Sequence, residues 1–362
     1  MTADAVARRL TALRRTLQDE GVHAFVTAHP ANVRYLTGFS GSNGLLWVGR
    51  GCAHLFTDGR YATQVEEEVP AGVIEITIAR DGVWTACREW VQPPLKGGSV
   101  AFESEHVSHQ RASDLAEWPE TVWIPARGWV ESLREVKEPG EVEAIRRAAR
   151  IATAAFADTL ALVRPGVLEL EIAADLEYRL RRAAPEGPAF ETIVLSGERT
   201  ALPHGRSGTR ALRAGDPLLI DFGATCEGYR CDLTRTLVLG RADRRWHSVH
   251  GAVCDALEQA AARCRPGTEA RDVDAAAREA LVARGYGDAI RHGTGHGLGL
   301  EVHERPRLHK SEARPLPAGA VVTVEPGLYF PGWGGVRVED DFHVTANGAE
   351  CLSPYPRTLA EV

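Results

Sequence analysis

The sequence predicts an α+β fold in two parts, an α/β domain over residues 1–130 and a larger domain over residues 131–362. Three observations predict it. Short apolar strands alternate with amphipathic helices in the first part, which is the pattern of an α/β domain. The second part carries two acidic strand–turn–strand segments, and a segment rich in glycine and histidine separates them. At 362 residues the chain is long enough to bury two cores.

The first domain is expected to begin with an amphipathic helix over residues 4–20, because apolar residues recur there every three or four positions. The glycine-rich loop at 38–44 does not follow the dinucleotide-binding fingerprint and is read as a turn. No histidine–carboxylate cluster is expected in this domain. The remaining elements expected here are strands at 24–27, 45–48, 54–57, 73–77, 100–103 and 122–124, with helices at 61–68, 82–90 and 110–117.

A polar stretch at 131–140, ending in Pro139-Gly140, is the expected junction between the domains. A long helix follows it, with one apolar stripe from Val142 to Val163. The further elements expected are helices at 168–184, 247–264 and 273–284, the last capped by Asp272, a strand at 190–195 and a strand-like stretch at 293–302.

The first acidic segment runs from Asp221 to Asp232. If its turn closes between Cys226 and Glu227, the two aspartates lie opposite each other. Facing residues have Cβ atoms about 4.5–5.5 Å apart. Two carboxylates there repel by about 4 kcal/mol at a separation of about 4 Å and an effective dielectric constant of about 20. A divalent cation is the obvious candidate to compensate this repulsion.

The second acidic segment is also expected to be a hairpin with two facing carboxylates, and its turn is Pro331-Gly332-Trp333. Reflection about Gly332 places Glu325 opposite Glu339. Two facing carboxylate pairs beside apolar strand residues are difficult to explain as solvated surface.

Three histidines, His292, His296 and His303, lie between the acidic segments. His292 and His296 have the spacing of a helical zinc site, but the glycines at alternate positions from Gly293 to Gly299 disfavour a helix. No P-loop lysine follows either. The remaining interpretation is that glycine lets backbone and imidazole approach a buried site closely.

Charge arithmetic predicts how many metal ions such a site holds. Four carboxylates carry four negative charges, and His296 would bind as a neutral imidazole, so two divalent ions balance the set. Two ions about 3.5–4 Å apart and bridged by carboxylates form a known hydrolytic arrangement. Oxygen-rich ligands favour Mn²⁺, with Co²⁺ and Zn²⁺ as alternatives.

The order and spacing of five residues resemble those of the metal ligands in the methionine aminopeptidase, aminopeptidase P and prolidase superfamily, the pita-bread metallopeptidases. The five residues are Asp221, Asp232, His296, Glu325 and Glu339. The VEPG and GVRVED forms are similar to its Xaa-Pro-cleaving branch, and RYLTGFSGSNG and LFTDGRY are similar to the creatinase-type N-terminal domain of that branch. The resemblance covers about residues 137–355 and includes ALPHG at 201–205, DFGA at 221–224, DLTRT at 232–236, HGTGHGLGLEVHE at 292–304, VEPGLY at 324–329 and GVRVED at 335–340.

The resemblance implies a role for each ligand. Asp221 would chelate one metal, His296 and Glu325 the other, and Asp232 and Glu339 would bridge the two. A hydroxide bridging the metals would attack the peptide bond, with Glu325 assisting as the base.

The resemblance also implies residues that contact the substrate. His204 and His303 would position it and stabilise the tetrahedral intermediate. His292 would lie in the pocket for the proline ring, and Arg337 would lie close to the metal ligands.

The activity implied is that of an aminopeptidase P, which acts on peptides with proline at the second position. The alternative is a prolidase restricted to dipeptides. Dipeptide-selective bacterial members of the family that the chain resembles have an extra loop with an arginine in the N-terminal domain. The loop at 37–44 is short and contains no arginine or lysine, although Arg34 is nearby, so the resemblance favours aminopeptidase P. A third alternative is a non-catalytic pita-bread binding protein, but such relatives lack the ligand set. The resemblance also implies a homodimer.

Composition excludes other classes of protein. The net charge is −7 and no basic block occurs, which argues against a nucleic-acid or anionic-membrane partner. No apolar run is long enough to span a bilayer, and the N-terminus lacks the apolar core of a signal peptide. Seven scattered cysteines without a CxxC motif favour neither a disulfide framework nor a thiolate zinc site, so a cytoplasmic location is expected.

Overall fold

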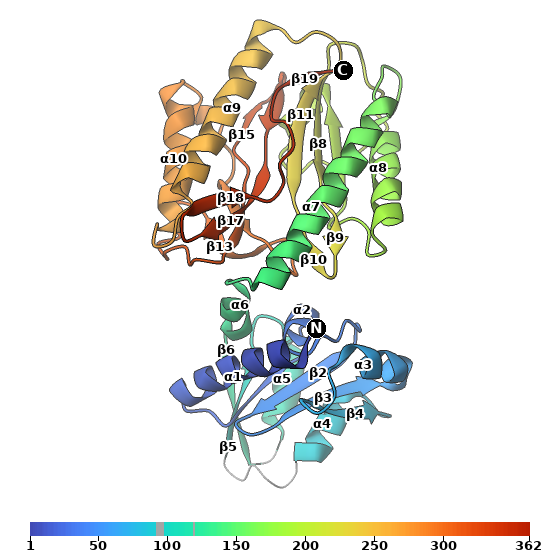
Figure 1. The fold of residues 1–362 in the computed structure, drawn as a ribbon, viewed down its shortest axis with the longest axis vertical. Coiled ribbons are helices and arrows are strands. Elements are labelled where there is room, and N and C mark those ends of the chain that lie inside the picture. Colours follow the sequence, from blue (N-terminus) through green and yellow to red (C-terminus); the bar gives the residue numbers. More distant parts are fainter. Residues whose placement is uncertain (92–97, 119) are drawn as a thin grey trace. The chain divides into compact units, whose positions relative to one another are not determined.

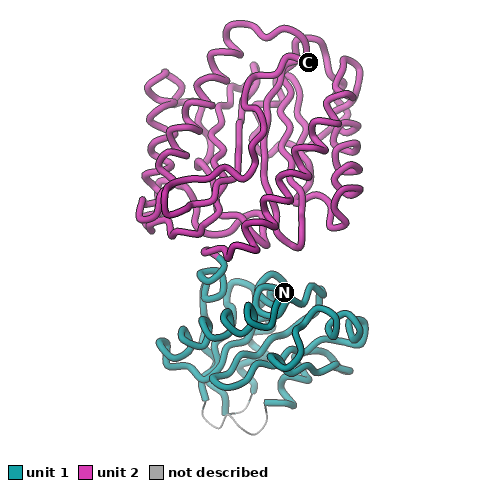
Figure 2. Tube along the Cα trace, viewed as in Figure 1, with its two compact units in different colours: residues 1–134 teal, residues 135–362 magenta. Residues whose placement is uncertain are grey.

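The computed structural model describes residues 1–91, 98–118 and 120–362. It divides into two compact units, residues 1–134 and residues 135–362 (Figure 2). The domain boundary expected at 130/131 falls inside helix α6 (Trp129–Arg134). Pro139 and Gly140 form the first turn of α7 (Pro139–Thr159), where proline is tolerated because the first helical N–H has no partner in the helix.

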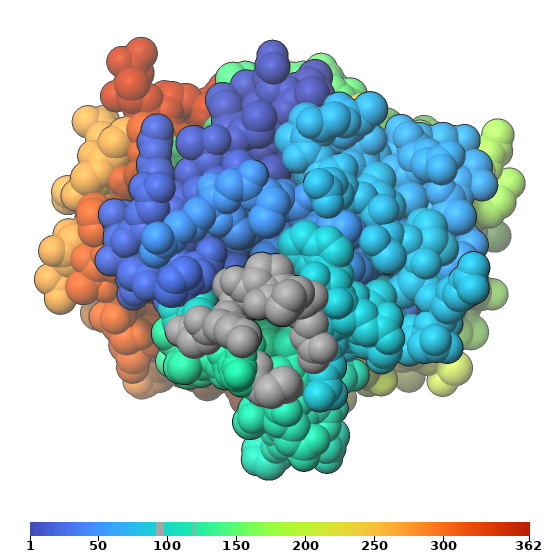
Figure 3. Space-filling model, turned by 90° about the horizontal axis from the view of Figure 1, so that it is seen from below, coloured from blue at the N-terminus to red at the C-terminus, as the bar shows by residue number. Residues whose placement is uncertain are grey.

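The first unit is a mixed sheet with helices, in which the described strands follow the order β4-β3-β2-β1-β5-β6 (Figure 1). In the space-filling view of the whole chain in Figure 3, the atoms coloured from blue to teal belong to this unit. The strands are β1 (Ala24–Thr27), β2 (Gly44–Gly49), β3 (Ala53–Asp58), β4 (Glu75–Ala79), β5 (Gly98–Glu103) and β6 (Thr121–Ala126). The helices are α1 (Ala3–Asp19), α2 (Pro30–Thr37), α3 (Ala62–Glu68), α4 (Val83–Val91), α5 (His109–Ala116) and α6, with a 3₁₀ turn η1 (Gly59–Tyr61).

The expected elements of this unit are confirmed to within a few residues, but the sequence did not predict the helices α2 and α6. The expectation that the unit lacks a histidine–carboxylate cluster is wrong. His29, His106 and Glu131 lie together, although they are far apart in the sequence.

The second unit contains two sheets, β19-β11-β8-β7 and β13-β12-β14-β17-β18, and two short ribbons, β9-β10 and β15-β16 (Figure 1). The strands are β7 (Ile193–Ser196), β8 (Pro217–Phe222), β9 (Thr225–Cys226), β10 (Tyr229–Arg230), β11 (Leu233–Val238), β12 (Gly295–Gly297), β13 (Glu304–Leu308), β14 (Val321–Val324), β15 (Gly327–Phe330), β16 (Gly334–Arg337), β17 (Asp340–Thr345), β18 (Gly348–Cys351) and β19 (Ala360–Glu361). The helices are α7, α8 (Glu169–Ala183), α9 (Arg244–Arg263) and α10 (Ala270–Ala283), with 3₁₀ turns η2 (Leu160–Leu162), η3 (Gly197–Ala201) and η4 (Gly287–Ala289).

Each sheet of this unit has its own hydrophobic core. Helices α7 and α8 pack on β7, β8 and β11, where Phe156 stacks on Phe222 with ring centroids 4.7 Å apart. Helices α9 and α10 pack on β14, β15, β16 and β17. Many of the helix residues in these cores are alanines, so helix and sheet approach closely. Burying this apolar surface is the main stabilisation of both halves.

The first acidic hairpin is shifted in register from the expectation. Asp221 pairs with Thr234, not with Asp232. The turn is centred between Glu227 and Gly228, which both have positive φ (53° and 84°), as a two-residue hairpin turn requires. Because the shift is two residues, Asp221 and Asp232 stay on one face of the ribbon as diagonal neighbours.

The register expected for the second acidic segment is confirmed. Gly327 pairs with Arg337 in the β15–β16 ribbon, and Val324 pairs with Asp340 where β14 meets β17. Both pairs reflect about Gly332, so the positions of Glu325 and Glu339 correspond across the ribbon.

Two further expectations about the second unit are wrong. Helix α10 begins at Ala270 behind Glu269, and Asp272 lies inside its first turn rather than at the cap. Of the stretch 293–302, only β12 is a strand.

None of the helices in the described part of the chain combines the length and the apolar composition that a membrane span requires.

Candidate metal centre

Asp232, His296 and Glu339 form a buried group whose ligand atoms all lie within 4.8 Å of one another. Asp232 directly precedes β11, His296 is the middle residue of β12, and Glu339 lies between β16 and β17. His296 Nε2 is 3.8 Å from Asp232 Oδ2 and 3.6 Å from Glu325 Oε1. The structure therefore brings four of the five predicted ligands together, with the carboxylates of Asp232, Glu325 and Glu339 close to the His296 imidazole.

Asp221, the fifth predicted ligand, lies at the end of β8 with its carboxylate only half satisfied. Its Oδ2 atom accepts a hydrogen bond of 2.6 Å from the Arg337 guanidinium. Its Oδ1 atom is buried and has no hydrogen-bond partner among the described residues. A buried carboxylate oxygen without a donor is costly, and a cation at this point would satisfy it. The residues present therefore fit a divalent metal site.

The electrostatics of the centre also favour a cation. Burial raises the pKa of Asp232 well above its usual range, and repulsion from Glu339 and Asp221 adds to the effect. Burial likewise raises the pKa of Glu339, with repulsion from Glu325. Burial lowers the pKa of His296 to about 4, so its imidazole is neutral near pH 7, as a metal ligand must be.

Glycines on both sides of His296 allow β12 to enter the site. A Cβ atom on Gly295 would lie 2.0 Å from the backbone oxygen of Thr323, and one on Gly297 would lie 2.1 Å from that of Arg305. No side chain fits at either position. The glycine-dependent close approach predicted from the sequence is therefore confirmed.

The backbone also sets the orientation of the His296 ring. Its Nδ1 atom lies 3.0 Å from the carbonyl oxygen of Gly297. When Nδ1–H donates to this carbonyl, the lone pair of Nε2 points toward the carboxylates. Metal-binding histidines are commonly oriented in this way.

A network of buried hydrogen bonds surrounds the acidic group. The Thr234 hydroxyl donates to Glu339 Oε2 at 2.7 Å and accepts from Arg337 Nε at 3.0 Å. Arg337 also donates to the Tyr329 hydroxyl at 2.9 Å, and that hydroxyl lies 2.8 Å from Nε2 of His292. Thr234 and Tyr329 were not predicted as site residues. Thr234 stands two positions after Asp232, which places both residues on the same face of the strand. This spacing is the sequence feature from which Thr234 could have been predicted.

All nine predicted site residues line one pocket of about 1050 Å³. Beyond the five predicted ligands these are His204, His292, His303 and Arg337. The His303 ring meets that of His296 edge to face, with centroids 4.3 Å apart. Apolar wall is supplied by Phe190, Ile193, Pro203, Val302 and Leu308.

A pocket that gathers carboxylates and imidazoles on a two-sheet α+β unit has the ligand chemistry of a metal-dependent enzyme. Residues 143–346 match the model of metallopeptidase family M24, and residues 9–136 match the creatinase/prolidase N-terminal domain. The chain belongs to metallopeptidase family M24.

Three relatives illustrate the range of names in the family. The chain is 32% identical over 359 residues to an Xaa-Pro dipeptidase of Pyrococcus furiosus, covering 97% of this chain and 99% of the relative. A solved Xaa-Pro dipeptidase from Bacillus anthracis matches with a TM-score of 0.94 and 33% identity, over 99% of this chain and 100% of the other. A solved X-Pro aminopeptidase from Thermotoga maritima matches with a TM-score of 0.89 and 36% identity, over 96% and 100%.

Proposed function

We propose that the chain is an aminopeptidase P, which hydrolyses the bond between the first residue and a proline at the second position of a peptide. The observation that carries the proposal is the convergence of all nine predicted site residues on one pocket. Its volume of about 1050 Å³ is slightly above the range of about 300–1,000 Å³ that is typical of ligand sites, so a peptide longer than a dipeptide has room to bind.

Asp221, Asp232, His296, Glu325 and Glu339 would hold two divalent ions, with Mn²⁺ as the expected metal. When bound, such ions polarise the scissile carbonyl and lower the pKa of water. The charges balance in this arrangement: the four carboxylates carry four negative charges, the imidazole is neutral, and two divalent ions carry four positive charges. Co²⁺ and Zn²⁺ remain alternatives for this ligand set.

The protein side chains would then handle the substrate and its proton. Hydrolysis adds the hydroxyl of a water molecule to the carbonyl carbon and its proton to the proline nitrogen, which carries no hydrogen of its own in this tertiary amide. We assign this proton transfer, from the attacking water to the leaving nitrogen, to Glu325. His204 and His303 would hold the scissile carbonyl and stabilise the oxyanion. His292, fixed by the Tyr329 hydroxyl, would form the wall against the proline ring. Arg337 would keep Asp221 in place.

A prolidase is the second candidate, and Arg307 is the observation that favours it. Arg307 lines the pocket on β13, where it pairs with His296 of β12. Its side chain is exposed. Among the described residues, no side chain forms an ion pair or hydrogen bond with its guanidinium group. A guanidinium in this position can bind the free carboxylate of a dipeptide.

A peptide-length series with Mn²⁺ separates the two candidates. We expect the wild type to cleave an Xaa-Pro-Yaa tripeptide and longer peptides, and Arg307→Gln to retain this activity. Arg206→Gln is the matched control, since Arg206 is also an exposed arginine of the pocket rim. If the wild type cleaves only Xaa-Pro dipeptides, and Arg307→Gln loses that cleavage while Arg206→Gln keeps it, the chain is a prolidase.

We further propose a homodimer in the cytoplasm, with an N-terminal domain of residues 1–130 and a catalytic domain of residues 131–362. All seven cysteines are free thiols, which supports a reducing compartment. Light scattering of the purified chain tests the dimer, and a mass of about one chain would contradict it.

A further inference from the structure

The first unit holds a second group of metal-ligating side chains. His29, His106 and Glu131 each offer a ligand atom, and these atoms lie within 4.8 Å of one another. His29 precedes the first residue of α2, His106 lies in the turn after β5, and Glu131 lies in the first turn of α6. Three segments that are remote in the sequence therefore meet at one point.

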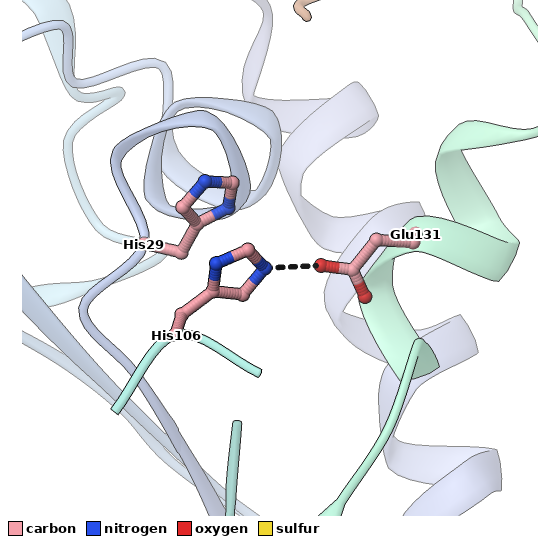
Figure 4. Close-up of side chains that lie close together, drawn as sticks. All are labelled: His29, His106 and Glu131. Atoms are coloured by element: carbon pink, nitrogen blue, oxygen red, sulfur yellow. Dashed lines mark ion pairs between the residues drawn. The ribbon is translucent and has the colours of Figure 1, made fainter. Parts of the chain in front are cut away.

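The two imidazoles lie face to face, and Glu131 approaches the edge of one of them (Figure 4). The ring centroids of His29 and His106 are 3.6 Å apart, with 7° between the ring planes. Glu131 Oε1 is 3.4 Å from Nε2 of His106.

Buried neighbours hold the carboxylate of this group in place. Asn32 Nδ2 donates to Glu131 Oε1 at 2.6 Å, and Arg134 donates to Asn32 Oδ1 at 2.7 Å. The Asn32 side chain is fully buried. Metal ligands are commonly oriented by such a second hydrogen bond. The carboxylate is thus presented to the imidazoles in a fixed position rather than left as a mobile surface group.

We propose that His29, His106 and Glu131 bind one divalent cation of the Zn²⁺ class. Two imidazole nitrogens and one carboxylate oxygen are a ligand set of zinc, with a fourth position left for water. The His106 side chain is 32% exposed, so an ion can reach the group from solvent. The oxygen-rich set in the second unit favours Mn²⁺, whereas this nitrogen-rich set favours Zn²⁺.

Zinc binding requires one ring to turn. Nitrogens bonded to one Zn²⁺ at about 2.0–2.1 Å lie about 3.3 Å apart with their lone pairs converging. In stacked rings the lone pairs lie in parallel planes and cannot converge on one ion. His106, on its exposed turn, is the ring that can rotate without disturbing the core. The bound ion would join α2, the turn after β5 and α6, and so would stabilise the first unit independently of the peptidase centre.

Counting bound zinc in the full chain tests this proposal. The wild type, His106→Ala and His109→Ala are dialysed against the same buffered Zn²⁺ solution, and zinc per chain is measured by elemental analysis. His109 is the matched control, since it is an exposed histidine of the same unit outside the group. We expect His106→Ala to bind one zinc ion fewer than the wild type and His109→Ala to bind the same number.

A second variant keeps the test valid if His106→Ala perturbs the fold. Glu131→Gln preserves the volume of the side chain and an oxygen for Asn32, and it should also bind one zinc ion fewer. In both variants Mn²⁺-dependent peptidase activity should remain at the wild-type level. Equal zinc content in the wild type, His106→Ala and Glu131→Gln would overturn the proposal.

Discussion

Glu339→Gln should make the metal-free protein more stable while removing most of the stabilisation by metal. Glu339 and Asp232 present carboxylate oxygens within 4.8 Å of each other. Two unit charges at that separation repel by about 3.5 kcal/mol at an effective dielectric constant of about 20. A glutamine at position 339 removes the repulsion and keeps an oxygen for the Thr234 hydroxyl.

The net gain is smaller than the repulsion because a charge-assisted hydrogen bond becomes a neutral one, a loss of about 1 kcal/mol. We expect about 2.5 kcal/mol, or about 5–10 °C in Tm for a unit of this size. The size of this gain depends on pH. Because the folded-state pKa of Glu339 is raised, the wild type loses stability as pH rises, so the gain is larger at pH 9 than at pH 6.

The assay is thermal unfolding of the wild type, Glu339→Gln and Glu191→Gln with a chelator and with excess Mn²⁺. Glu191 lines the same pocket with its side chain 71% exposed, so its variant should stay within about 0.5 kcal/mol of the wild type. An ion at 100 times its Kd contributes about 2.7 kcal/mol, which reverses the order in Mn²⁺. A variant that is less stable than the wild type in chelator at pH 9, or equally stabilised by Mn²⁺, would refute this reasoning.

Two further outcomes test other parts of the structure. Burial raises the pKa of Glu103 to about 7, above its value of 4.5 in an unfolded chain, so the wild type should lose about 3 kcal/mol between these pH values. Glu103→Gln should lack this loss in urea titrations across pH, and an unchanged slope would contradict the assignment. Gly295→Ala should weaken Mn²⁺ binding and lower Tm, because its methyl group meets the Thr323 carbonyl, whereas Gly251→Ala, in open space on α9, should raise Tm. A Gly295→Ala protein with wild-type Mn²⁺ affinity would count against the required close approach.

Sequence patterns predicted the elements of this fold well wherever periodicity carried the signal. The apolar stripe that begins at Val142 did become the buried face of α7. The register of the second acidic ribbon also followed from its turn, because glycine at position 332 marks the centre of reflection unambiguously.

The first hairpin shows where such reasoning fails. Glu227-Gly228 is typical of a turn, but the sequence does not show which two residues occupy its central positions, and the expected centre between Cys226 and Glu227 was one residue too early. The error left the predicted site intact because a shift of two residues preserves the face of a strand.

The cluster of His29, His106 and Glu131 could not be predicted at all. Its members share no spacing, and only the pairing of β1 with β5 and the placement of α6 bring them together. Spacing predicts partners within one strand, hairpin or helix, whereas contacts between remote segments depend on the whole sheet order.

The peptidase centre lies on the seam between two cores, with Asp221 and Asp232 on one sheet and His296, Glu325 and Glu339 around the other. A cation bound there would link two halves of the unit that each have their own hydrophobic core. If the two halves separated, the cation would lose ligands and dissociate before either half unfolded. The rate at which metal escapes into a chelator should therefore follow the amide exchange rate of the backbone along that seam.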